Sequence, residues 1–145
     1  MQRAGYCGPS PLKIVLEHFG VKKTEKEIIK NIKKGKYGIE AEELLKFAKT
    51  LGLKGFIRDF SSLKDISKYI KKGIPIIVEW FLDDDGHFSV VIGIDRENIY
   101  LQDPDLGHRR AITRKIFKRL WFSFAGDYIY HREDINLRRM LVIHK

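Results

Sequence analysis

The sequence predicts a single α+β domain whose helices come first along the chain and whose antiparallel strands follow. Apolar residues recur at helical spacing as far as Gly73, and beyond it short β-rich segments alternate with turns that contain Asp and Gly. No internal repeat or linker divides the chain, so we expect one domain over residues 1–145. Elements grouped in this way pack with the helices on one face or end of an antiparallel sheet.

The first helix is expected just after Cys7, and Gly20 can end it in the left-handed conformation that helix C-caps favour. Its apolar stripe follows the spacing i, i+3, i+4 and i+7, at Leu12, Val15, Leu16 and Phe19. A second helix opens at Thr24, which can form a capping box with Glu27. The residues of this helix that we expect in the core are Ile28, Ile29 and Ile32.

Two further helices complete the first half. A third helix is expected over residues 40–51, with Leu44, Leu45, Ala48 and Leu51 facing inward. A fourth, shorter helix follows Ser62 and ends before Gly73.

Short strands dominate the second half, and we expect them at residues 74–80, 87–94, 99–102 and 127–130. Residues 90–92 are apolar without alternation, so their strand is expected to be central and covered on both faces. Thr113 can cap a short helix that ends before Trp121 and carries Ile116, Phe117 and Leu120.

Composition narrows the classes of protein to consider. No apolar run approaches the roughly 20 residues of a membrane-spanning helix, and the N-terminus lacks the apolar stretch of a secretory signal, so we expect no membrane span and a cytoplasmic location. The formal charge of +9 favours anionic partners such as acidic peptides, nucleic acid or lipid headgroups.

Cys7 is the single cysteine of the chain, so it can form no internal disulfide and no multi-thiolate metal site. A free thiol at a helix start is either an inert small side chain or a reactive thiolate whose pKa the positive end of the helix lowers. An imidazole within hydrogen-bond reach would activate it fully.

His87 is the best-placed histidine, because it opens an apolar strand directly after a turn. Of the others, His18 is expected inside the first helix and His108 in a turn. His131 lies in a charged segment and His144 at the C-terminal end. The next expected strand ends at Asp103, whose carboxylate can orient the imidazole if the two strands pair. The Asp-rich turn at residues 83–85 fits no metal-site pattern, and we predict no metal and no cofactor.

Four segments in chain order resemble the C39-like peptidase family, which is related to the bacteriocin-processing peptidases. They are Gln2, Cys7-Gly8-Pro9-Ser10-Pro11-Leu12, Gly86-His87-Phe88-Ser89-Val90-Val91, and Leu101-Gln102-Asp103-Pro104 followed by Gly107. The resemblance covers nearly the whole chain and implies a papain-like cysteine peptidase fold, in which N-terminal helices pack on a C-terminal antiparallel sheet. It implies that Cys7 is the nucleophile and His87 the base, that Asp103 orients the base, and that Gln2 lines the oxyanion hole.

The resemblance further implies a hydrolase that cleaves a peptide or protein substrate through an acyl-enzyme. The alternative is an inactive domain of the same fold that binds an anionic partner, an acidic peptide or nucleic acid, through its basic C-terminal quarter. The aromatic residues Tyr6, Tyr37, Trp80 and Trp121 either line a substrate groove or fill the core.

Overall fold

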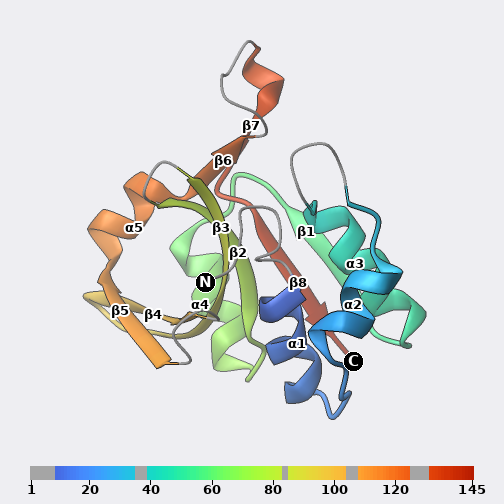
Figure 1. Cartoon of the computed structure of the whole chain (residues 1–145). Helices are drawn as coiled ribbons and strands as arrows, with labels where there is room; N and C mark the ends of the chain where they lie inside the picture. The colour runs from blue at the N-terminus through green and yellow to red at the C-terminus, as the bar shows by residue number, and fades with distance from the viewer. Residues whose placement is uncertain (1–8, 35–38, 83–84, 104–107, 125–130) are drawn as a thin grey trace.

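The computed structural model describes residues 9–34, 39–82, 85–103, 108–124 and 131–145, and within them it contains a six-stranded antiparallel sheet and a two-stranded one (Figure 1). The helices are α1 (Pro9–His18), α2 (Glu25–Asn31), α3 (Ala41–Thr50), α4 (Leu63–Lys71), α5 (Arg114–Leu120) and the 3₁₀ helix η1 (Arg132–Asp134). The strands are β1 (Lys54–Arg58), β2 (Ile76–Leu82), β3 (Asp85–Ile94), β4 (Asn98–Asp103), β5 (His108–Thr113), β6 (Phe122–Phe124), β7 (Ile135–Leu137) and β8 (Met140–His144).

The large sheet has the order β1-β8-β2-β3-β4-β5, and the small one pairs β6 with β7. Strands β2, β3 and β4 each pair with the next strand along the chain, so β2 to β5 form a meander. The C-terminal strand β8 returns to lie between β1 and β2, where both of its edges are paired. The sheet therefore joins the middle third of the chain to its C-terminal strand.

Helices cover both faces of the large sheet. Helices α1, α2 and α3 pack on the face that presents Ile77, Val90 and Leu141. Helices α4 and α5 pack on the opposite face, which presents Val78 and Val142. The α+β class and the packing of N-terminal helices on the sheet are confirmed, and the structure adds a second covered face (Figure 1).

The residues that were predicted to cap the helices do so in the structure. The side chains of Thr24, Ser62 and Thr113 accept hydrogen bonds from backbone N–H groups in the first turns of α2, α4 and α5. Gly20, just beyond the end of α1, has a φ of 81°, which a residue with a Cβ rarely adopts. The four helices predicted in the first half and the short helix after Thr113 are confirmed.

Some of the expected elements and faces were wrong. Ile29 is exposed and not in the core, because the short helix α2 buries only a narrow stripe that includes Ile28. Three strands of the large sheet were not predicted, namely β1, β5 and β8. His108 opens β5 and does not lie in a turn. The strand expected at residues 127–130 lies outside the described residues.

Candidate active site

His87 lies on β3 near one end of the large sheet, where β2 ends and β3 begins. Its Cα partner across the ladder is Trp80 of β2, and the next residue, Phe88, belongs to the core to which α1 contributes. His87 itself is half-buried, so part of its side chain reaches the surface.

The backbone beside His87 is held rigidly by a buried hydrogen bond. The indole Nε1 of Trp80 donates to Ser89 Oγ at 2.9 Å, and the exposed fractions of these two residues are 1% and 4%. The Trp80 ring also lies 6.0 Å from the ring of Phe117 on α5. Trp80 thus connects the strand that carries His87 to the helix behind the sheet.

Asp103 ends the strand that pairs with β3. The β3–β4 ladder joins Val90 to Gln102, so continuing the same register by one residue brings the backbone of Asp103 to the level of Ser89. In an antiparallel pair, the backbone of Asp103 is then diagonal to that of His87. The pairing on which the sequence interpretation depended is confirmed.

Helix α1 is oriented with its N-terminal end toward this end of the sheet. At its C-terminal end, His18 Nε2 donates to the Gly73 carbonyl at 2.7 Å, just ahead of β2. Strand β2 runs from there toward Trp80 and the level of His87. Because α1 packs on β2 and β3, its first residue, Pro9, is directed toward the His87 end of the sheet.

Gln2 and Cys7 lie outside the described residues, and so do Tyr6 and Tyr37 from the predicted aromatic groove. Trp80 and Trp121 are each 1% exposed and belong to the core between the sheet and α5, so they do not line a groove. Of the two interpretations, the one that places these two residues in the core is therefore correct.

A polar cluster near the same end of β2 was not predicted. Glu79, the residue before Trp80, accepts a hydrogen bond from the Ser123 hydroxyl of β6. Burial raises the pKa of the Glu79 carboxyl above its usual value, against the opposing effects of Ser123 and Arg139. A charged residue within the apolar run of β2, residues 76–82, is the sequence signal that marks this position.

Arg139 connects this cluster to residues in the first half of the chain. Its Nε and Nη2 donate to the two carboxylate oxygens of Asp59 at 2.7 and 3.0 Å, and its Nη1 donates to Glu42 at 3.1 Å. The Asp59 hydrogen bonds raise the pKa of the Arg139 guanidinium. This bidentate pair attaches the start of β8 to the chain that follows β1.

Within the described residues, no helix is long and apolar enough to span a membrane, and no three His, Cys, Asp or Glu side chains gather as a metal site would require.

Comparison with known proteins gives a family and two relatives. The sequence model of the peptidase C39 family matches residues 2–125. An uncharacterized protein of Methanothermobacter thermautotrophicus is 30% identical over 130 residues, which are 89% of this chain and 84% of the relative. A second one, from Methanothermobacter marburgensis, is 30% identical over 138 residues, 92% of this chain and 87% of the relative.

Solved structures share the fold at low sequence identity. The peptidase domain of Streptococcus ComA, a bi-functional ABC transporter, has a TM-score of 0.76 and 18% identity, with 99% of this chain and 94% of that chain covered. A putative C39-like peptidase from Bacillus anthracis has a TM-score of 0.72 and 17% identity, with 97% and 89% covered. A double glycine motif protease from an AMS/PCAT transporter, in complex with its leader peptide, has a TM-score of 0.72 and 20% identity, with 99% and 87% covered. The fold is that of papain-like C39 peptidase domains.

Proposed function

Because the chain belongs to the peptidase C39 family, we propose that it is a cysteine peptidase that cleaves a peptide or amide bond through an acyl-enzyme on Cys7. The observation that carries this proposal is the pairing of β3 with β4, which brings the backbones of His87 and Asp103 to one end of the sheet. The N-terminal end of α1 is directed toward that same end, and Cys7 precedes Pro9 by two residues.

In this proposal His87 activates Cys7. The imidazole accepts the thiol proton, and the positive end of the α1 dipole further stabilises the thiolate. Asp103 accepts a hydrogen bond from the second ring nitrogen and so fixes the tautomer of His87. Diagonal neighbours of an antiparallel pair lie about 7–8 Å apart, which a carboxylate and an imidazole on one face can bridge.

The reaction has two halves. The Cys7 thiolate attacks the carbonyl carbon, the peptide C–N bond breaks, and the protonated His87 gives its proton to the leaving amine. Water then attacks the thioester while His87 accepts its proton, and the carboxylic acid product leaves as the Cys7 thiolate re-forms. The proposed reaction needs no cofactor, because Cys7 supplies the nucleophile and His87 accepts and returns each proton within the cycle.

Gln2 is proposed to donate from its side-chain amide to the oxyanion of the tetrahedral intermediate, together with the Cys7 backbone N–H. Losing one donor of this kind typically lowers kcat by a factor of about 10² or more. A Gln2→Ala variant should therefore keep a reactive thiol and lose most of its turnover.

The substrate class that we propose is a peptide or protein. The fold relative from an AMS/PCAT transporter was solved with a leader peptide bound, which supports a peptide ligand for this fold. We place the reaction in the cytoplasm, where a free catalytic thiol stays reduced.

An activated ester tests the acyl-transfer step without a known substrate. The wild-type protein is mixed with p-nitrophenyl acetate, and a burst of p-nitrophenolate close to one equivalent per protein molecule is expected, with acetyl found on Cys7 by mass spectrometry. Cys7→Ser and His87→Ala should each lose the burst.

His144→Ala is the matched control, because His144 lies on β8, the opposite flank of β2 from β3, and its Nδ1 contacts only the carbonyl of Lys145 among the interactions described. This variant should keep the full burst. An unchanged burst in His87→Ala, or acetylation of lysines in place of Cys7, would contradict the proposal.

A further inference from the structure

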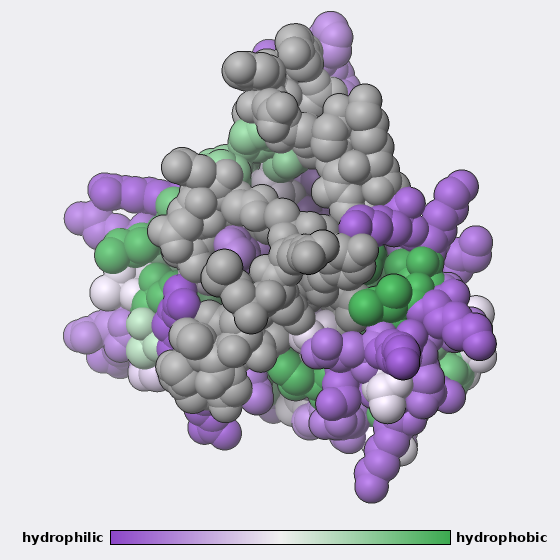
Figure 2. Space-filling view, in the orientation of Figure 1, coloured by the Kyte–Doolittle hydropathy of each residue, from purple (hydrophilic) through white to green (hydrophobic). Residues whose placement is uncertain are grey.

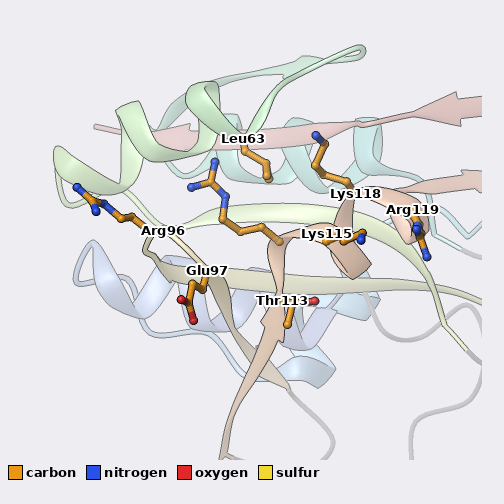
Figure 3. A pocket seen from close by; sticks show the side chains of 8 residues that line it. Leu63, Arg96, Glu97, Thr113, Lys115, Lys118 and Arg119 are labelled. Atoms are coloured by element: carbon orange, nitrogen blue, oxygen red, sulfur yellow. The ribbon is translucent and has the colours of Figure 1, made fainter.

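A basic pocket opens at the other end of β3 from His87, between α4, α5 and the β3–β4 turn (Figure 3). Its volume of about 720 Å³ falls within the range of ligand pockets in proteins, roughly 300–1,000 Å³. The residues that line this basic pocket are Leu63, Arg96, Glu97, Thr113, Arg114, Lys115, Lys118 and Arg119. Five of them are cationic and one is a carboxylate.

Four of the five cations of the basic pocket have no ion-pair partner in the part of the chain that the structure describes. Among the described residues, no carboxylate lies within ion-pair distance of Arg96, Lys115, Lys118 or Arg119. Figure 3 shows Glu97 at the edge of the group, with its carboxylate directed away from Lys118. Hydrophilic side chains project from the α5 edge of the molecule in Figure 2.

Helix α5 carries this charge against its own stability. Four of its seven residues are Lys or Arg and none is acidic, so the pairs Arg114–Lys118 and Lys115–Arg119 place like charges one turn apart. Arg114 and Lys115 also lie in the first turn, where the helix dipole disfavours cations. A bound anion would relieve all of these repulsions.

The pocket is built on α5 and the β3–β4 turn, which two hydrogen bonds join directly. The backbone N–H of Arg114 donates to the Glu97 carbonyl at 2.8 Å, and Arg114 Nη1 donates to the Asp95 carbonyl at 3.0 Å. The Asp95 carboxylate accepts from the Tyr100 hydroxyl and from the backbone N–H groups of residues 97 and 98, and these hydrogen bonds lower its pKa. The negative charge of Asp95 is therefore held in the turn, where it offsets part of the charge of Arg114.

We propose that the basic pocket binds an acidic segment of the peptide substrate, remote from the bond that is cleaved. This inference rests on the proposed peptidase function. The cations are distributed along α5 and the turn and do not converge on one point, so they match several spaced carboxylates better than a single phosphate group. Leu63 and the aliphatic parts of the long side chains supply apolar contacts for the peptide between its carboxylates.

The distance along β3 sets the spacing between the two parts of the substrate. From Asp95 to His87 the strand advances eight residues, which is about 26 Å at 3.3 Å per residue. An extended substrate therefore needs about eight residues or more between its acidic segment and the scissile bond.

Fluorescence anisotropy with a defined probe tests the inference. The probe is a fluorescein-labelled peptide of about ten Glu, Asp and Gly residues, long enough to span the pocket when extended. Its counterpart has Gln and Asn in place of the acids. The wild-type protein should bind the acidic probe and not the amide counterpart, and Lys115→Gln/Lys118→Gln should weaken binding about tenfold.

The matched control is Lys26→Gln/Lys30→Gln on α2, which removes the same charge from an exposed helix far along the chain from the pocket. Retained binding in this control supports the pocket. Equal weakening in both double variants would reduce the effect to net charge and overturn the inference. The absence of binding, or tighter binding of a single-stranded DNA of similar length, would also overturn it.

Alkylation of Cys7 by iodoacetamide in the same samples separates this inference from the proposed function. A reactive Cys7 without pocket-dependent binding overturns the pocket alone. Pocket-dependent binding with an unreactive Cys7 supports the pocket as a site for acidic peptides and overturns the peptidase function.

Discussion

The hydrogen bond between Trp80 and Ser89 should show as a coupling free energy between two substitutions. Trp80→Phe removes the Nε1 donor and leaves the Ser89 hydroxyl, 4% exposed, without this partner. An orphaned buried polar group costs about 1–3 kcal/mol, and the lost ring adds about 1 kcal/mol. We therefore expect Trp80→Phe to lower the free energy of unfolding by about 2–4 kcal/mol.

Ser89→Ala has the reciprocal effect, since it leaves the indole N–H buried and unpaired, at about 1–3 kcal/mol. In the double variant neither orphaned group remains, so its destabilisation should be smaller than the sum of the single values by at least about 1 kcal/mol. Urea unfolding followed by far-UV circular dichroism measures all four proteins without relying on Trp fluorescence.

Trp121→Phe provides the control for this cycle, because its indole Nε1 donates to the Arg139 carbonyl and not to Ser89. Combined with Ser89→Ala, it should be additive. Additivity of Trp80→Phe with Ser89→Ala would contradict the expected coupling, since it would mean that the two side chains are not paired in the folded protein.

Three further substitutions test other parts of the structure. Glu79→Gln should gain stability relative to the wild type as pH rises. The raised pKa of Glu79 means that the wild-type carboxyl stabilises the fold fully below its unfolded pKa, and that this stabilisation is lost as pH passes its folded pKa. A difference in the free energy of unfolding that stays constant between about pH 4 and 8 would contradict this. Gly55→Ala should lower the free energy of unfolding by about 1–3 kcal/mol, because the new Cβ would lie 2.4 Å from the Val142 carbonyl oxygen, and an unchanged Tm would be the opposing result. Arg139→Lys keeps the charge and loses the two-pronged contact with Asp59, so a loss of about 1–2 kcal/mol is expected, and full stability would show that charge alone suffices.

Helices were predictable from the sequence where local signals agreed. At α4, Ser62 and the residues before Gly73 mark both ends, and the structure has a helix between them. The apolar period alone was less informative in α2, where Ile28 is buried and its neighbour Ile29 is exposed. A two-turn helix buries one narrow stripe, and only tertiary packing decides which isoleucine lies in it.

Strand β8 could not be predicted in the same way. It is buried on both faces, so it has no alternating pattern, and it follows an Arg-rich stretch close to the C-terminus. Its place between β1 and β2 depends on pairing with Lys54–Arg58, more than 80 residues earlier in the chain. Such long-range pairing leaves no local periodicity to read.

In the candidate site, too, some contacts could be predicted from the sequence and others could not. The pairing that brings Asp103 near His87 followed from two adjacent strands and a short connection, which sequence order can suggest. The Glu79–Ser123 contact joins residues 44 positions apart through a second, two-stranded sheet, and the sequence offered only the isolated acid within an apolar run.

The activation of Cys7 by His87 is the central claim, and the pH dependence of Cys7 alkylation tests it most directly. The rate of reaction with iodoacetamide is measured from about pH 4 to 10 in the wild type and in His87→Ala. Activation by His87 should give rapid alkylation of the wild type well below the usual thiol pKa of about 8.5, and in the variant the midpoint of the profile should return to about 8.5. The same profile in both proteins, with a midpoint near 8.5, would contradict it.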